Sequence, residues 1–396
     1  MNNAVASDPI TIIGGGIGGL FSAVALQARG LSCRVYEAAD KVKPVGAGLL
    51  LAANALAVFA RASPALLADV YARGQNLAEL NKPTFDIVDA GGQTLLGGFD
   101  VARLQHEFGH GLIAIKRGEL HTALLAALPA GTLITGKRLT SLSQHAARVH
   151  IGFADGGQIE SGLLIAADGA KSVARRHLFP DVALRYSGQT SYRGMARMNW
   201  RELGDLPAAE MWGDWLRFGF TPVGGRQVYW FATLPAQMGQ PHAPPVEAMA
   251  QIARRSLNMH PNVARLLDAT EPENVLQTDI LDMPALPAWH RGRVVLLGDA
   301  AHATTPNLGQ GACQAIEDGY VLAQQLATSA DLPQACVAYT RIRKPKADWV
   351  VRTARRLGGI VHVRNPLLRG LRNAALRAMP AVATTRQAER VYRLNY

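Results

Sequence analysis

The chain has 396 residues, of which 48% are hydrophobic, and this is enough apolar material for one large domain or for two domains that share a core. Its formal net charge is +11, but residues 341–396 alone hold 14 Lys and Arg residues against Asp348 and Glu389, so the preceding part is close to neutral. A basic surface confined to one terminal segment excludes the chain-wide footprint that nucleic-acid binding requires.

The three cysteines, Cys33, Cys313 and Cys336, show no CxxC spacing, so the sequence predicts neither a disulfide framework nor a metal site. The start MNNAVASDP has no basic region, and the apolar stretch after it is broken by glycines, which argues against a signal peptide or a spanning helix. We therefore expect a cytoplasmic protein.

The first elements form a predicted βαβ unit. An apolar run precedes Gly14, Gly16 and Gly19, which supply a G-x-G-x-x-G turn, and a helical stretch leads to a second strand that ends at Glu37. Glycines allow the tight turn and a close approach of the backbone to a pyrophosphate, and an acid 18 residues after Gly19 can accept both ribose hydroxyls. This context predicts a dinucleotide site, although a bare glycine-rich turn remains the alternative.

Further along the chain, residues 117–128 are predicted to be helical, and residues 133–153 and 158–170 alternate as strands do, with a hairpin turn at 154–157. Residues 189–235 are rich in aromatic side chains on short runs and predict an antiparallel sheet. From Gly311 onward the pattern is mostly helical, and we expect interruptions at three prolines, namely Pro345, Pro366 and Pro380.

Two later segments place acids at strand ends. Asp168-Gly169 follows the apolar run LLIAA, and Gly298-Asp299 follows RVVLL. Ligands of open α/β sheets lie beyond the carboxyl ends of the strands, so three such ends meeting at one crevice predict a cofactor longer than the first turn alone can bind.

This set of motifs resembles the flavoprotein aromatic hydroxylases typified by para-hydroxybenzoate hydroxylase, over nearly the whole chain. Within that family the likeness is strongest to 2-heptyl-4-quinolone 3-monooxygenases, through VGAGLLLAANAL, GDAAHATTPNLGQGACQAIEDG and the spacing of WGDWLRFGF before YWFATL. Urate hydroxylases and zeaxanthin epoxidases share much of the pattern. The resemblance implies an α/β fold, with a Rossmann-like FAD-binding domain, an interleaved antiparallel-sheet substrate domain and C-terminal helices.

The implied division of the chain is discontinuous. Residues 8–76, 106–182 and 288–345 are expected to form the FAD-binding domain, residues 77–105 and 183–287 the substrate domain, and residues 346–396 a basic helical segment.

The resemblance assigns the FAD contacts to the glycine turn, the ribose acid and its neighbours, and the two later loops. These are Gly14, Gly16, Ile17, Gly18, Gly19, Glu37, Ala38, Lys43, Arg117, Asp168, Asp299, Pro306, Gly309, Gly311 and Ala312. The helix opening at Gly311 would direct unpaired N–H groups and its positive dipole end at the reduced flavin. Two alternatives stay open: Asp168 as a residue that only fixes loops, and Arg117 as an ordinary surface arginine.

Substrate residues are expected on the aromatic-rich sheet. We predict a pocket formed by Tyr192, Arg193, Trp212, Phe218 and Phe220, with Arg193, Tyr192 and Pro306 nearest the chemistry. Packing of these aromatic side chains in the core is the alternative. His302 follows the cofactor acid so closely that we interpret it as structural rather than as a base.

The implied activity is that of a single-component monooxygenase. In this family NADPH or NADH reduces the flavin, O2 adds to it, and the C4a-hydroperoxide hydroxylates a small aromatic substrate, here an alkylquinolone at carbon 3. The sequence shows neither a second nucleotide-binding unit nor a redox CxxC, unlike disulfide reductases. A geranylgeranyl-type FAD reductase and a non-catalytic carrier remain alternatives.

The basic C-terminal segment contains a predicted amphipathic helix. Leu367, Leu368, Leu371, Ala375 and Met379 share one predicted helix face. We expect this helix to pack on the FAD domain with its arginines in solvent, and weak peripheral membrane contact is the alternative. Either a monomer or a homodimer fits the sequence.

Overall fold

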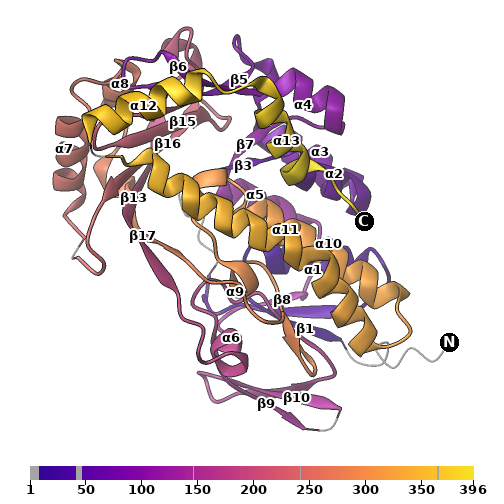
Figure 1. Cartoon of the computed structure of the whole chain (residues 1–396). Coiled ribbons are helices and arrows are strands. Elements are labelled where there is room, and N and C mark those ends of the chain that lie inside the picture. The colour runs from indigo at the N-terminus through magenta and orange to yellow at the C-terminus, as the bar shows by residue number, and fades with distance from the viewer. Residues whose placement is uncertain (1–8, 42–46, 146, 241, 364) are drawn as a thin grey trace.

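The computed structural model describes residues 9–41, 47–145, 147–240, 242–363 and 365–396. Two lobes, each built on its own large sheet, are visible in Figure 1, and a long helix near the C-terminus runs across the front of both. The predicted α/β class and the helical C-terminal region are confirmed.

The first lobe contains a six-stranded sheet in the order β18-β19-β12-β1-β2-β8. All its pairs are parallel except β18 with β19. Three of its strands are short apolar runs that are buried throughout, as expected where both faces of a parallel sheet are covered. Its strands are β1 (Ile10–Ile13), β2 (Cys33–Tyr36), β8 (Leu133–Ile134), β12 (Leu164–Ala166), β18 (His290–Arg291) and β19 (Val294–Leu296).

Two three-stranded sheets accompany this lobe. One has the order β11-β10-β9 and includes the predicted hairpin turn at 154–157; the other has the order β3-β7-β4. Their strands are β9 (Leu139–His145), β10 (Arg148–Phe153), β11 (Gln158–Ser161), β3 (Gly48–Leu51), β7 (Ile113–Lys116) and β4 (Gln75–Asn76).

The second lobe contains a seven-stranded sheet in the order β17-β13-β16-β15-β14-β5-β6, in which only the β14–β5 pair is parallel. Residues 189–235 therefore form antiparallel strands, as predicted. The strands are β5 (Thr84–Asp89), β6 (Thr94–Asp100), β13 (Arg185–Arg197), β14 (Ala209–Trp212), β15 (Arg217–Pro222), β16 (Gln227–Pro235) and β17 (Leu276–Asp282).

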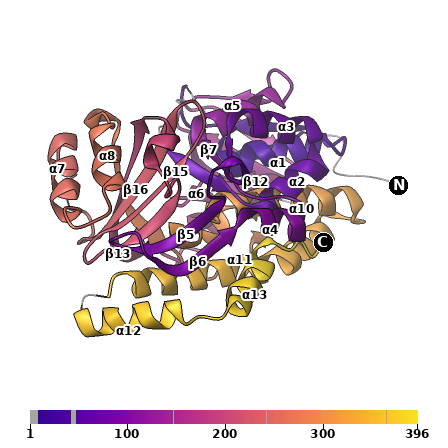
Figure 2. The same ribbon diagram turned by 90° about the horizontal axis from the view of Figure 1, so that it is seen from above.

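Helices cover the two sheets unequally. Figure 2 shows α7 and α8 on one side of the seven-stranded sheet, which we call its outer face, and they share a hydrophobic core with it. The opposite, inner face is turned toward the first lobe, because Tyr229 of β16 packs against Gly48 of β3. In chain order, the α-helices before Asp299 are α1 (Ile17–Gln27), α2 (Ala53–Ala62), α3 (Pro64–Arg73), α4 (Val101–Phe108), α5 (Arg117–Ala126), α6 (Val173–Leu178), α7 (Pro245–Arg255) and α8 (Asn262–Asp268).

The C-terminal part is helical, with one difference from the prediction. Pro366 begins a helix and Pro380 precedes one, but Pro345 lies inside α11, so the expected interruption there is wrong. Pro345 is exposed, and the packing of the other side of α11 outweighs the loss of one helical hydrogen bond. The predicted domain boundary at 345/346 falls inside this helix. These helices are α9 (Asp299–His302), α10 (Gly311–Thr328), α11 (Leu332–Val361), α12 (Pro366–Arg377) and α13 (Ala381–Tyr392).

Candidate functional site

The glycine-rich turn joins β1 to α1 and is shaped for a close backbone approach. Gly14 has φ +105°, and a Cβ there would lie 2.3 Å from the carbonyl oxygen of Ala167. A Cβ on Gly19 would lie 1.9 Å from the Gly14 oxygen, whereas at Gly16 it would meet nothing within 4 Å. No side chain caps α1, so its first N–H groups are free to bind a pyrophosphate in the open space at Gly16.

The acid that follows β2 lies next to this turn. Glu37 accepts hydrogen bonds from the backbone N–H of Gly15, at 2.6 Å, and of Ala39, at 2.9 Å. Its carboxylate is therefore held where a ribose bound beyond the turn could reach it. Ala38 is adjacent and half-buried, and Lys43, the other predicted contact in this stretch, lies outside the described residues.

At the end of β12, Asp168 serves the protein's own backbone. Its Oδ2 accepts from the N–H groups of Val173, at 2.7 Å, and Ala174, at 3.2 Å, and so caps α6. The other oxygen, Oδ1, is buried and has no hydrogen-bond partner in the described structure. These contacts favour the loop-fixing interpretation of Asp168 and leave one oxygen available to a ligand.

The third strand end carries Asp299 into the same space. Asp299 is exposed, but the protein atoms around its carboxyl displace part of its hydration shell. This loss of hydration raises the pKa of the carboxyl. The charges of His302 and of Arg117, an exposed residue at the start of α5, partly oppose that shift. Buried Arg175 ties two of these loops together by donating to the carbonyls of Ala170, at 2.6 Å, and Ala300, at 3.4 Å.

The predicted flavin loop lies just beyond. Pro306 begins a 3-10 turn and is exposed, and Gly309 has φ +62°. Helix α10 begins at Gly311 with neither a capping side chain nor an acid in its first turn, and Ala312 in that turn is half-buried. Open space surrounds both glycines, because a Cβ would meet nothing at Gly309 and only a methyl group, at 3.6 Å, at Gly311. Free N–H groups and a positive dipole end fit an electron-rich ring system.

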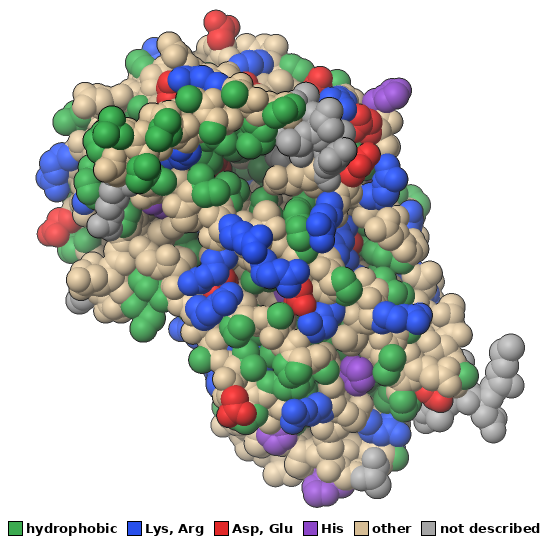
Figure 3. All heavy atoms as spheres, in the orientation of Figure 1, with side chains coloured by type: hydrophobic (Ala, Val, Ile, Leu, Met, Phe, Trp, Pro, Cys, Tyr) green, Lys and Arg blue, Asp and Glu red, His purple; other side chains and the backbone are tan. Residues whose placement is uncertain are grey.

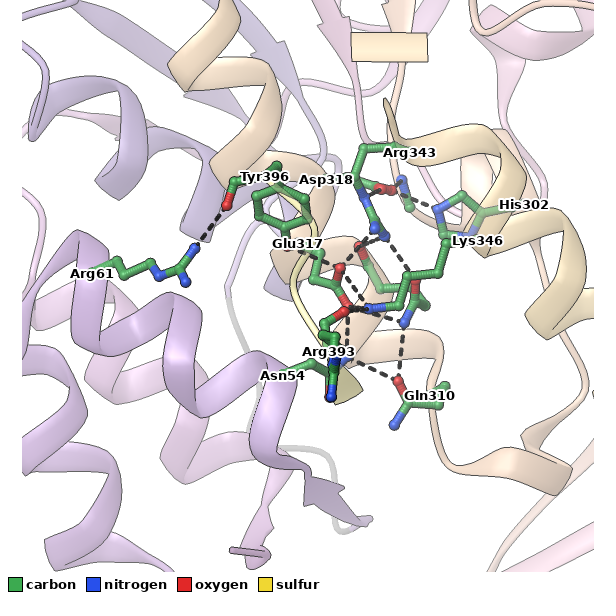
Figure 4. Close-up of polar contacts among 12 residues, drawn as sticks. Asn54, Arg61, His302, Gln310, Glu317, Asp318, Arg343, Lys346, Arg393 and Tyr396 are labelled. Carbon is green, nitrogen blue, oxygen red and sulfur yellow. Dashed lines mark hydrogen bonds and ion pairs between the residues drawn. The ribbon is translucent and has the colours of Figure 1, made fainter. Parts of the chain in front are cut away.

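A buried polar network holds α10 in place (Figure 4). The carboxylate of Asp318 in α10 accepts hydrogen bonds from His302 Nε2, at 2.5 Å, and from Arg343 Nε, at 2.8 Å. The adjacent Glu317 binds Arg343 at 2.7 Å and Lys346 at 2.8 Å. Both carboxylates are fully buried, and their partners offset their charge. His302 is therefore structural, in line with the prediction.

The same network includes Gln310, the residue immediately before α10. Asn54 of α2 donates to Gln310 Oε1 at 3.1 Å and to Glu317 Oε1 at 2.6 Å. Gln314 also donates to Gln310, at 3.0 Å. The position of the α10 N-terminus thus depends on side chains from α2, α9 and α11, which are remote from one another in sequence.

The predicted substrate pocket needs correction. Tyr192, Phe218 and Phe220 point to the outer face of the seven-stranded sheet, where they are buried against α7 and α8. Phe218 stacks on Trp230 there, with ring centroids 5.4 Å apart. A strand alternates its side chains between two faces, so these three cannot also line a pocket on the inner face.

Arg193 is on the inner face, together with aromatic and apolar side chains that the sequence did not single out. The register pairs Arg193 with Phe231 and Met195 with Tyr229. All four side chains are half-buried, and the Tyr229 and Phe231 ring centroids are 6.4 Å apart. Gly219 makes room for the Phe231 ring, since a Cβ there would lie 2.2 Å from it. We call Met195, Tyr229 and Phe231 the inner wall.

A buried ion pair joins this face to the flavin loop. Arg217 of β15 binds Glu210 of β14 at 2.5 Å and donates to the side chain of Asn307. The other oxygen of Glu210 accepts from the indole of Trp212, at 2.5 Å. Trp212, a predicted pocket residue, is 2% exposed and packs beside Val361, so it supports Glu210 rather than lining the wall. The Nε of Arg217 is buried and has no partner in the described structure.

Sequence reasoning missed Arg217 and Glu210, although a signal was present. Each stands in a strand whose other residues are apolar or small, LRFGF and AEMW, and charged side chains are almost never fully buried unless they are paired. A charge in such a strand therefore predicts a partner, but the identity of the partner depends on the register of β14 with β15.

Comparisons with known proteins agree with this geometry. The sequence model of the FAD binding domain family matches residues 8–354. The chain is 34% identical to the aurachin C monooxygenase/isomerase of Stigmatella aurantiaca, covering 93% of this chain and 94% of that protein. It is 31% identical to the 2-heptyl-3-hydroxy-4(1H)-quinolone synthase of Pseudomonas aeruginosa, covering 97% of both. The structure of Klebsiella pneumoniae HpxO complexed with FAD and uric acid superposes with a TM-score of 0.87 at 27% identity, covering 98% and 97%.

Proposed function

This chain belongs to the FAD binding domain family, and from that premise we propose that its substrate is an uncharged bicyclic heteroaromatic ring of the 2-alkyl-4-quinolone class, hydroxylated at carbon 3. The protein is an FAD-dependent monooxygenase of aromatic substrates that uses NAD(P)H and O2. Its substrate is the part that remains to be proposed.

FAD fits the described residues. The turn from Gly14 to Gly19 and the start of α1 would hold the pyrophosphate, Glu37 the ribose, and Asp299 with Arg117 the chain between the two halves. The start of α10 would hold the flavin ring. When bound, FAD would supply the redox chemistry, namely reduction by NAD(P)H and transfer of one oxygen atom of O2 to the substrate, the other atom leaving as water.

The observation that carries the substrate proposal is the composition of the inner wall. Met195, Tyr229 and Phe231 present apolar and aromatic surface, half-buried, on the face of the sheet that is turned toward the first lobe. Such a wall suits a flat, uncharged ring with an alkyl substituent, because it excludes water and gains from apolar contact. Two relatives each cover more than nine-tenths of this chain. One is named aurachin C monooxygenase/isomerase, and the other is named 2-heptyl-3-hydroxy-4(1H)-quinolone synthase.

The unpartnered donor of Arg217 favours a substrate that carries an exocyclic oxygen. Arg217 is held by Glu210 and Asn307 and keeps an unsatisfied donor, Nε, at the edge of the wall. We place the substrate's 4-oxo group on this donor, where a charge-assisted hydrogen bond from the guanidinium would orient the ring and fix the position of carbon 3. A vinylogous amide activates its own carbon 3, so Glu210, whose two oxygens are already bound, need not act as a base.

The test is a substrate panel with the FAD-loaded protein and NADPH or NADH under air. We expect 2-heptyl-4-quinolone to stimulate oxygen uptake and to yield a product one oxygen atom heavier, by mass spectrometry. We expect 2-heptylquinoline, which lacks the 4-oxo group, to give neither. Turnover of urate or a simple phenol in place of the quinolone would reject the proposed substrate class and leave the monooxygenase assignment standing.

A further inference from the structure

Helix α12 presents its apolar side to solvent. Leu367, Leu368 and Leu371 are 80%, 56% and 67% exposed, and Met379, just beyond the helix, is 41% exposed. Figure 3 shows hydrophobic side chains gathered over this helix at the top of the molecule. We call these four residues the α12 ridge. Contiguous exposed apolar surface of this kind marks an interaction site more often than scattered single residues do.

The polar side of the same helix is fastened to the second lobe, which corrects the expectation that the helix packs on the FAD domain; of its arginines, Arg372 is buried and Arg377 is still partly in solvent. Arg369 pairs with Asp214 at 2.8 Å, and Arg377 pairs with Asp89 at 2.9 Å. Arg372 is 9% exposed and donates to the Val361 carbonyl at 2.7 Å. A guanidinium at this position caps the C-terminal end of α11. Specific polar contacts therefore hold the leucines outward.

Basic side chains lie on the same face of the molecule. Arg352 and Arg356 of α11 are exposed and have no carboxylate partner among the described residues. Figure 3 shows Lys and Arg side chains gathered in the middle of this face, over α11 and below the ridge. We call Arg352 and Arg356 the α11 basic pair. Trp215, next to the Asp214 that anchors Arg369, adds a 48% exposed indole beside α12.

We propose that this face docks on a phospholipid surface rich in anionic headgroups. The α12 ridge enters the boundary between headgroups and acyl chains, and the α11 basic pair binds the phosphates. Among the described residues no helix is long and apolar enough to cross a membrane, so the contact is with the surface only. Trp215 suits the same depth, because indoles favour the interface between apolar chains and water.

Charge favours a membrane over a second copy of the chain as the occupant. In a two-fold contact through the α12 ridge, the facing ridge is made of leucines and a methionine and so offers the α11 basic pair no carboxylate. An anionic lipid surface complements the ridge and the basic pair together. This inference does not depend on the substrate proposal, and its test requires no substrate.

The experiment is flotation of the full-length, FAD-loaded protein with vesicles. We expect binding to vesicles of phosphatidylethanolamine and phosphatidylglycerol, little binding to pure phosphatidylcholine, and release by salt. A Leu367→Ser, Leu371→Ser double variant should bind about tenfold more weakly or worse, because apolar burial drives insertion. An Arg352→Gln, Arg356→Gln variant should lose about tenfold on anionic vesicles only.

Leu257→Ser provides the matched control, because Leu257 is also 80% exposed but lies between α7 and α8 and is not part of the α12 ridge. It should bind vesicles as the unchanged protein does, and FAD content should be the same in all variants. Absence of binding by the unchanged protein would overturn the proposal, as would an equal loss in Leu257→Ser. A dimer in analytical ultracentrifugation that the leucine double variant converts to a monomer would assign the ridge to self-association instead.

Discussion

Phe231 and Phe218 lie on neighbouring strands, and the faces to which they point decide what each can do. Phe231 belongs to the inner wall, and its ring centroid lies 5.3 Å from the guanidinium of Arg217. Phe218 is 0% exposed in the outer core against α7 and α8. The one side chain can meet a ligand, whereas the other contributes only to packing.

The contrast predicts opposite results for two alanine variants. Phe231→Ala should lower kcat/KM for the aromatic substrate by about 10- to 100-fold, since it removes apolar contact from the site. Phe218→Ala should lower the free energy of unfolding by about 3–5 kcal/mol and leave kcat/KM of the folded protein nearly unchanged. Steady-state kinetics and urea unfolding of both variants measure this. Equal kinetic losses in the two would show that the inner wall is not the substrate side.

At the scale of elements, α9, α10 and α11 meet at one buried cluster of charges. Burial alone would lower the pKa of His302, but the Asp318 carboxylate, 2.5 Å away, raises it above its usual 6.5. Burial would likewise raise the pKa of Asp318, but His302 and Arg343 hold it below its usual 3.8. His302 and Asp318 are therefore both charged between pH 3.8 and pH 6.5.

This cluster predicts a pH-dependent stability. The contribution of His302 is fully present below pH 6.5 and is lost as the pH rises through its raised pKa, because the folded state then holds a proton that the unfolded state has released. His302→Gln keeps a hydrogen-bond donor but cannot titrate. Its stability deficit relative to the unchanged protein should be largest at pH 6 and shrink toward pH 9, with a slope of at most about 1.4 kcal/mol per pH unit. A deficit that is constant with pH in urea unfolding would show that His302 is neutral in the fold.

For the whole molecule, the cofactor site is the junction of parts that are distant in sequence. The carboxyl ends of β1, β12 and β19 lie side by side at one edge of the sheet, and α10 packs against Gly18 and Gly298 at that edge. A ligand bound there stabilises only the folded state, so FAD at a free concentration c should increase the free energy of unfolding by RT ln(1 + c/Kd), about 2.7 kcal/mol at a hundredfold excess over Kd, and so raise the thermal midpoint.

Gly16→Ala should abolish that gain without weakening the apoprotein. A Cβ at Gly16 meets no protein atom within 4 Å and φ is −73°, so the added methyl group clashes only with a bound pyrophosphate. Gly14→Ala is the contrasting variant, because φ is +105° and a Cβ would lie 2.3 Å from Ala167, so the apoprotein itself should be less stable. Differential scanning calorimetry with and without FAD distinguishes the two. A full FAD-induced rise in Gly16→Ala would contradict this placement of the pyrophosphate.

The sequence alone determined the features that depend on local pattern. The turn around Gly14, the strand ends at Asp168 and Asp299 and the helix after Gly309 were predictable, because each is a short run whose backbone needs appear directly in residue type. The antiparallel sheet at 189–235 was predictable from its aromatic, turn-punctuated pattern.

Only the tertiary structure decided which side of each element faces what. Phe218 and Phe231 carry the same side chain, and the register of β15 with β16, not residue type, assigns them to opposite faces. The pairing of Arg217 with Glu210, and of Arg343 with Glu317 and Asp318, joins residues whose proximity depends on strand and helix packing. The outward leucines of α12 follow from the same cause, because the carboxylates and carbonyls that bind its arginines come from other elements of the fold.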